Sequence, residues 1–102
     1  MDGVARIDRV VAQLEVCLDG TFPFPKLKVK VLQRQGGDYL AVPNVAIRHR
    51  VTREPDWIAG LGNTAEEAVE DLLPSFVRGV RENTPQGGLT ESDFEWSAPE
   101  DF

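Results

Sequence analysis

The residues that could carry chemistry in this chain are a single histidine, a single cysteine and a cluster of acids. His49 has no second histidine to share a metal ion with it, and no serine or carboxylate lies beside it for general acid or base work. Cys17 lies between Val16 and Leu18, which suits a packed, inert thiol. A small hydrolase or nuclease that uses His49 therefore ranks last, and we expect no catalytic residue, no metal site and no cofactor.

The acids Glu66, Glu67, Glu70 and Asp71 are close enough in sequence to resemble a divalent-metal site or a pair of catalytic acids. They occupy the first turns of a predicted helix, where the helix dipole favours negative charge, so we interpret them as a solvated surface. The preceding Gly60-x-Gly62 lacks the third glycine of a dinucleotide-binding loop. We expect a turn there.

Residues 65–81 are predicted to form the main helix. Thr64 and Glu67 have the spacing of a capping box, which satisfies the free amides of the first turn. Pro74 interrupts the backbone hydrogen bonding, but the apolar phase continues past it, which indicates one kinked helix. The apolar stripe consists of Ala65, Ala68, Val69, Leu72, Leu73, Phe76, Val77 and Val80.

Residues 2–19 fit two patterns. A helical stripe runs through Val4, Ile7, Val11, Leu14 and Leu18, whereas Ala12, Leu14, Val16 and Leu18 also alternate as in a strand. We favour the helix because its pattern spans more residues. Residues 21–25 hold two prolines and form a connector whose phenylalanines pack on the core.

The sheet signal is clearest in the middle of the chain. Residues 27–32 and 39–42 alternate around a Gln-Gly-Gly-Asp turn, which predicts a hairpin, and residues 45–51 form a third strand. Residues 53–56 are expected to turn, and residues 57–59 to lead into the helix. The predicted fold is α+β: a small antiparallel sheet of about three strands on one long kinked helix, with an N-terminal helix or strand.

Length and composition fit one small domain. We expect residues 1–83 to form a single α+β domain, followed by an acidic tail that contains aromatic residues over 84–102. No apolar run approaches the roughly 20 residues needed to cross a bilayer, and no secretory signal is evident. A cytoplasmic protein without a membrane partner is expected.

The net charge of −6 is unevenly distributed. Residues 26–53 hold seven Lys or Arg and one acid, whereas the remaining residues hold four bases and sixteen acids. If adjacent strands project their bases to one side, the sheet would offer a cationic face for nucleic acid or an anionic ligand. The candidates are Lys28, Lys30, Arg48 and Arg50. The overall acidity and the lack of interleaved aromatics make nucleic acid a weaker candidate than protein.

The tail combines acids with large aromatic residues, which a purely solvating segment would not need. Its acids would steer the approach of a basic partner, and its aromatics would be buried in the interface. The expected partner-binding residues are Glu91, Asp93, Phe94, Glu95, Trp96 and Phe102. Exposed apolar patches closing a homodimer are an alternative.

The sequence around the glycine turn resembles the HicB antitoxin family, whose members have a similar G-x-T-x-E-E-A run at the start of their main helix. The matching residues are Gly62, Thr64, Glu66, Glu67 and Ala68, preceded by the 27–42 hairpin. No DNA-binding module follows the helix. The resemblance implies a small αβ protein that inhibits by covering a partner's active surface. We therefore expect a non-catalytic, antitoxin-like inhibitor or a protein of phage–host conflict, with a basic toxin or defence nuclease as its partner.

Overall fold

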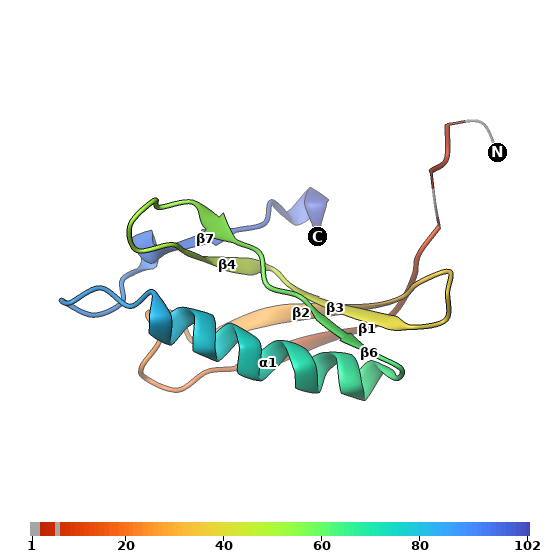
Figure 1. The fold of residues 1–102 in the computed structure, drawn as a ribbon, viewed down its shortest axis with the longest axis horizontal. Helices are drawn as coiled ribbons and strands as arrows, with labels where there is room; N and C mark the ends of the chain where they lie inside the picture. Colours follow the sequence, from red (N-terminus) through yellow and green to blue (C-terminus); the bar gives the residue numbers. More distant parts are fainter. Residues whose placement is uncertain (1–2, 6) are drawn as a thin grey trace.

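The computed structural model describes residues 3–5 and 7–102 and shows an elongated α+β fold of 50 × 29 × 20 Å (Figure 1). Its described residues form two antiparallel sheets and one long helix, α1 (Ala65–Glu82). The first sheet has the order β1 (Arg9–Cys17), β2 (Lys26–Gln33), β3 (Tyr39–Pro43), β6 (Gly60–Gly62). The second has the order β5 (Pro55–Asp56), β4 (Val45–Arg48), β7 (Phe94–Trp96). The α+β class predicted from the sequence is confirmed.

Helix α1 begins at the predicted cap. The Thr64 hydroxyl accepts a hydrogen bond from the Glu67 amide at 3.1 Å, while the Glu67 carboxylate accepts from the Asn63 amide at 2.9 Å. The helix is continuous through Pro74, so residues 65–82 form one helix rather than two. A kink at Pro74 stays a prediction. The end of α1 is closed by Asn83, whose amide and side chain both donate to the Gly79 carbonyl.

The N-terminal helix prediction is wrong, because residues 9–17 form strand β1. Ala12, Leu14 and Val16 lie opposite Val31, Val29 and Leu27 of β2, so the alternating pattern and not the helical stripe describes this segment. Pairing with the apolar face of β2 favours the strand over the helix for residues 9–17. The register with β2 shifts between Val10 and Ala12, which marks a β-bulge.

The predicted hairpin is confirmed as β2 and β3, but the third strand differs from the prediction. β4 ends at Arg48, and residues 50–52 form a turn instead of continuing the strand. The chain changes sheets at Asn44, whose amide donates to the Lys28 carbonyl and whose side-chain oxygen accepts from the Lys28 amide, both at 2.9 Å. β4 therefore leaves the first sheet and pairs with β5 and β7.

Two segments predicted as turns contain short strands. Pro55–Asp56 forms β5, and Gly60–Gly62 forms β6, which pairs with β3 over Tyr39–Ala41. Gly60 is buried against α1, where a Cβ atom would lie 2.2 Å from the Ala68 carbonyl oxygen. Glycine is needed here for close packing of strand on helix, not for a tight turn.

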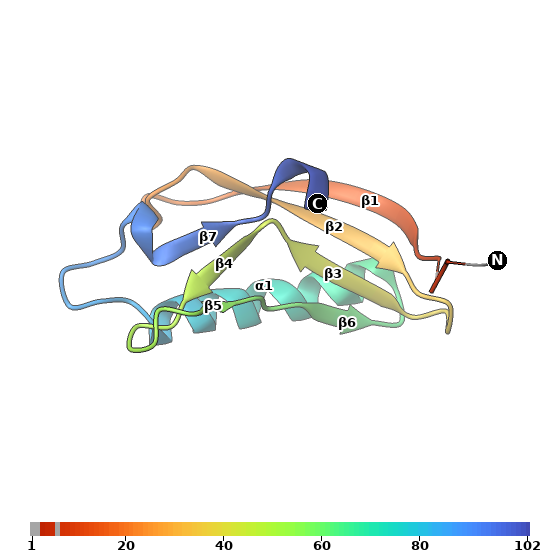
Figure 2. The ribbon, with the colours of Figure 1, turned by 90° about the horizontal axis from the view of Figure 1, so that it is seen from above.

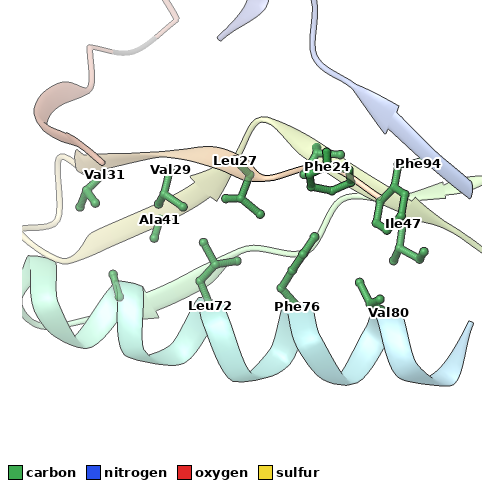
Figure 3. Close-up of a cluster of buried hydrophobic side chains, with 12 residues drawn as sticks. Phe24, Leu27, Val29, Val31, Ala41, Ile47, Leu72, Phe76, Val80 and Phe94 are labelled. Carbon is green, nitrogen blue, oxygen red and sulfur yellow. The ribbon is translucent and has the colours of Figure 1, made fainter. Parts of the chain in front are cut away.

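The core lies between α1 and the two sheets (Figure 3). Every fourth residue of the helix stripe, Ala68, Leu72, Phe76 and Val80, is fully or almost fully buried. Facing them are Leu27, Val29, Val31, Ala41, Val45 and Ile47 from the strands. Phe24 of the connector joins this core, and Phe22 stacks on Phe76 with ring centroids 6.4 Å apart, as predicted.

The last part of the chain folds against the second sheet. A 3₁₀ turn at Glu91–Asp93 leads into β7, which pairs with β4 so that Phe94 lies opposite Ile47 and Trp96 opposite Val45. A second 3₁₀ turn follows at Pro99–Asp101. Figure 1 shows the C-terminal turn lying on the side of the sheets away from α1. Whether residues 1–83 fold without it stays a prediction.

Candidate protein-binding surface

The aromatic residues predicted to bind a partner differ in their accessibility. Phe94 is only 4% exposed and packs edge-on against Phe24, with ring centroids 4.8 Å apart. It belongs to the protein's own core and presents no surface to a partner. Trp96 is 41% exposed and also packs edge-on against Phe24.

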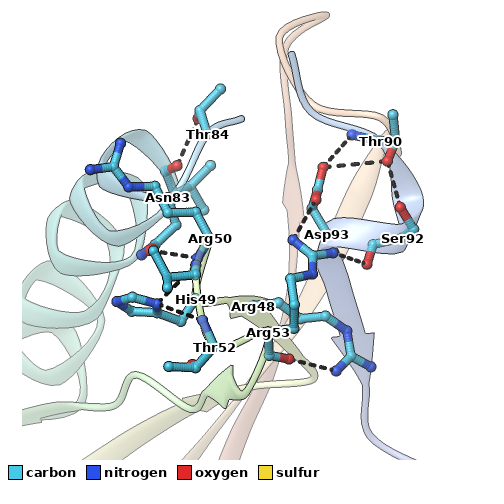
Figure 4. A network of polar contacts seen from close by, with 12 residues as sticks. Arg48, His49, Arg50, Thr52, Arg53, Asn83, Thr84, Thr90, Ser92 and Asp93 are labelled. Atoms are coloured by element: carbon cyan, nitrogen blue, oxygen red, sulfur yellow. Dashed lines mark hydrogen bonds and ion pairs between the residues drawn. The ribbon is translucent and has the colours of Figure 1, made fainter. Parts of the chain in front are cut away.

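The tail acid Asp93 is buried and held by its own chain (Figure 4). Its carboxylate accepts from the Thr90 amide at 2.9 Å and from Arg53 Nη1 at 3.0 Å. Burial raises the pKa of Asp93, but the hydrogen bonds from Thr90 and Arg53 outweigh it, so the pKa lies below its usual value. Arg53, at a φ of 65°, also donates to the Ser92 carbonyl. Asp93 therefore fixes the tail to the turn after β4.

Other acidic and basic segments meet in the same way. Arg48 binds the Glu95 carboxylate at 2.9 Å, and Lys30 donates to the Phe102 carbonyl while lying 4.7 Å from the centre of its ring. On the hairpins, Lys26 pairs with Glu15, and Arg34 pairs with Asp38. Most of the bases of residues 26–53 thus have partners within the fold, whereas most of the acids form no ion pair between described residues. Glu91, also a predicted binding residue, is exposed.

The four bases proposed for an anionic ligand come from two different sheets and a turn. Lys28 and Lys30 lie on the same face of β2, whereas Arg48 lies in the other sheet and Arg50 in the turn that follows it. Since β2 and β4 are not neighbours, the premise of adjacent strands is wrong. Lys30 and Arg48 are moreover engaged by the tail.

The residues considered for catalysis have structural contacts. Nδ1 of His49 accepts from the amides of Val51 and Thr52, which closes the turn after β4 (Figure 4). Asp71 accepts from the Leu61 amide at 2.9 Å and so ties β6 to α1. Among residues 3–5 and 7–102, no group of three or more His, Cys, Asp or Glu could hold a metal ion.

Cys17 is exposed, so the prediction of a packed thiol is wrong. It lies opposite Lys26, on the face of β1 that points away from the Leu27 side of β2. Its sequence neighbours Val16 and Leu18 pack against the core instead, because side chains alternate between the two faces of a strand.

Strand β1 holds the densest group of exposed apolar side chains. Of the nine large apolar residues exposed in the described part of the chain, Val10, Val11 and Leu14 lie in β1, and Val4 and Ile7 lie just before it. β1 is the end strand of its sheet, and α1 packs on β6, β3 and β2 (Figure 2). The strand therefore extends the sheet beyond the cover of the helix. We call β1 with Val10, Val11, Ala12 and Leu14 the β1 surface.

An apolar row continues from β1 across the face of the sheet that points away from α1. Val10 lies opposite Leu32, Leu32 opposite Leu40, and Leu40 opposite Leu61. Directly opposite residues share a face, so the four side chains form one line across four strands. Val10 and Leu61, at its ends, are 57% and 49% exposed.

A groove lies on the other face, between β1 and the start of α1. It has a volume of about 350 Å³, and its apolar lining comes from Ala12, Leu14, Val31, Ala65 and Val69. Glu66 and Glu70 of α1 also line it and are exposed. β1 thus borders accessible apolar surface on both faces.

Sequence reasoning missed the β1 surface, although its signal was present. When a strand has apolar residues on both faces, its apolar and polar residues no longer alternate regularly. The spacing of its apolar residues can then resemble that of an amphipathic helix. Val10 and Leu14 lie on opposite faces of β1, so they fit a helical stripe although the segment is a strand.

Comparison of the chain with protein-family models, with curated proteins and with solved structures found no match. No helix within the described residues has the length and apolar character required to span a membrane.

Proposed function

We propose that this chain is a non-catalytic protein-binding protein that recognises its partner through the β1 surface. The observation that carries the proposal is an edge strand of nine residues with exposed apolar side chains on both faces. Proteins that remain monomeric protect such edges with charges, prolines or short strands, because unpaired backbone groups recruit other chains. β1 has one bulge near its start and a regular register from Ala12 to Cys17.

Burial of the β1 surface would supply the binding energy. Complete burial of one Val or Leu side chain contributes roughly 1.5–3 kcal/mol, and Val10, Val11 and Leu14 are each between 38% and 57% exposed. Three partly exposed residues together with the adjoining apolar row provide the apolar centre that protein interfaces require. Trp96 is the one large apolar residue of the tail in the exposed class, and Phe102 is half-buried.

The resemblance to HicB antitoxins implies how binding would act. The chain would inhibit its partner in the cytoplasm by covering the partner's active surface. The net charge of −6 favours a basic partner such as a toxin or a defence nuclease, since opposite net charges accelerate association. Binding through β1 leaves Asp93 and Glu95 in their internal ion pairs.

The test is affinity capture from the native host with the wild-type chain and with a Val10→Lys/Leu14→Lys variant. We expect the wild type to retain a stoichiometric protein and the variant to lose it by about tenfold or more, because both substitutions place charge in an apolar interface. Val51→Lys is the matched control, since Val51 is 75% exposed and lies in the turn after β4. Thermal unfolding of all three proteins verifies that each is folded.

A partner retained equally by the wild type and the β1 variant would overturn the proposed surface. Inhibition is measured separately, by assaying the captured partner with increasing amounts of this chain. An uninhibited partner would contradict the antitoxin-like role while leaving binding intact.

A further inference from the structure

The groove beside β1 is lined by apolar residues and by two glutamates. A segment that binds in it therefore needs both apolar and basic groups. Leu14 and Val69 lie on its floor, and Glu66 and Glu70 line it from the helix. We propose that an extended segment of the partner adds to β1 as a further strand and carries Lys or Arg at two alternate positions that face Glu66 and Glu70. This inference rests on the proposed function and specifies the partner's chemistry.

The backbone of β1 is suited to strand addition. β1 pairs with β2 on one side, and in the described structure no strand pairs with its other side. Alternate residues of a strand direct their N–H and C=O groups to each side, so the free side of β1 offers a row of donors and acceptors. The bulge lies before Ala12, which leaves Ala12–Cys17 in regular register for a new strand.

The spacing of the two glutamates matches alternate residues of a strand. Glu66 and Glu70 are four residues apart, which is about 6 Å along a helix axis, and alternate strand residues are about 6.8 Å apart. β1 and α1 both run along the long axis of the molecule (Figure 1). The aliphatic stems of Lys or Arg would lie on the apolar floor while their charged ends reach the carboxylates.

The two glutamates take no part in the internal ion pairs that the structure describes, so their carboxylates are available to a bound segment. Glu66 and Glu70 are exposed, and neither takes part in a salt bridge between described residues. A second copy of the chain is a poorer occupant, because its β1 would direct Ala12, Leu14 and Val16 to the helix side. None of these three residues is basic, so a homodimer would leave both carboxylates unmatched.

The test uses a fluorescein-labelled peptide with blocked ends, Thr-Val-Thr-Lys-Thr-Lys-Thr-Val-Thr, and a matched peptide with Glu in place of both Lys. Fluorescence anisotropy at low salt measures the binding of each to the full chain. We expect the Lys peptide to bind about tenfold more tightly, because two exposed charge pairs replace two repulsive ones. The preference should vanish in Glu66→Gln/Glu70→Gln and persist in Glu82→Gln, which changes an exposed acid at the far end of α1.

Strand addition is tested by methylating alternate backbone nitrogens of the Lys peptide. One peptide is methylated at the odd-numbered amides and another at the even-numbered amides. Only one set can face β1, so we expect one peptide to lose binding and the other to retain it. Equal binding of the Lys and Glu peptides, or equal effects of the two methylation patterns, would overturn the inference.

The outcomes separate this inference from the proposed function. If a partner is captured through β1 but the Lys peptide shows no preference, the protein binds a partner of different chemistry and the inference fails. If the Lys peptide binds as expected but no partner depends on β1, the proposed function fails alone. A dimer in sedimentation that Leu14→Lys dissociates would assign the edge to a second copy and also overturn the inference.

Discussion

Asp93 shows how one residue can change the interpretation of a whole segment. The acidic sequence around it predicts that it binds a partner. In the structure it is buried, accepts from the Thr90 amide, and pairs with Arg53. The sequence contained the local part of this arrangement, since Thr90 and Asp93 have capping-box spacing, but Arg53 lies 40 residues away. No local pattern could identify that partner.

We predict that Asp93→Asn lowers the free energy of unfolding by about 1–2 kcal/mol at neutral pH, because a charged hydrogen-bond acceptor is lost at a buried position. The pKa of Asp93 is depressed in the folded protein, so its stabilisation is present above the unfolded pKa of about 4 and is lost as the pH falls through the lower folded value. Urea unfolding at a series of pH values should show the wild type and the variant converging below about pH 4. Glu91→Gln, at an exposed acid of the same turn, is the control. A constant difference down to the acid unfolding of the protein would contradict the assignment.

At the scale of elements, the contact between β6 and α1 depends on Gly60. We predict that Gly60→Ala lowers the free energy of unfolding by about 3 kcal/mol, because its Cβ would lie 2.5 Å from the Leu72 amide nitrogen as well as close to the Ala68 carbonyl. Gly20→Ala is the matched control, since an added Cβ there meets no atom within 4 Å. Chemical denaturation of both variants measures the difference. Similar stabilities would mean that β6 can move away from the helix at little cost.

The elements that could be predicted from the sequence are those whose signals are local. The cap at Thr64 and the apolar stripe up to Val80 define α1, and the alternation around Gly36-Gly37 defines the β2–β3 hairpin. The alternation of residues 12–18 leaves β1 as one of two alternatives, and the sequence does not indicate β7, whose partner β4 lies far away along the chain. The candidate surface was missed because Val10 and Leu14 fit a helical stripe, and because the position of β1 at the end of its sheet depends on the order of the strands.

At the scale of the molecule, the internal matching of charges argues against nucleic-acid binding. Arg48 and Arg53 bind tail acids, and Lys30 is held by Phe102. We predict no mobility shift of mixed-sequence duplex or single-stranded DNA at physiological salt, which places any dissociation constant above about 10⁻⁴ M. A shift that weakens with added salt and with Lys28→Ala would contradict this prediction and restore the basic strands as a binding surface.

The pairing of β4 with β7 also has a consequence for how the chain is made. Arg48 and Glu95 are 47 residues apart, so at about 5–20 residues per second the ribosome needs roughly 2–9 seconds to deliver the second after the first. During that interval the nascent chain holds Ile47 without Phe94, its neighbour across the sheet. Long-range pairing of this kind slows folding, and the exposed strand can aggregate before it is covered. The final closure of the core therefore has to wait for the synthesis of β7.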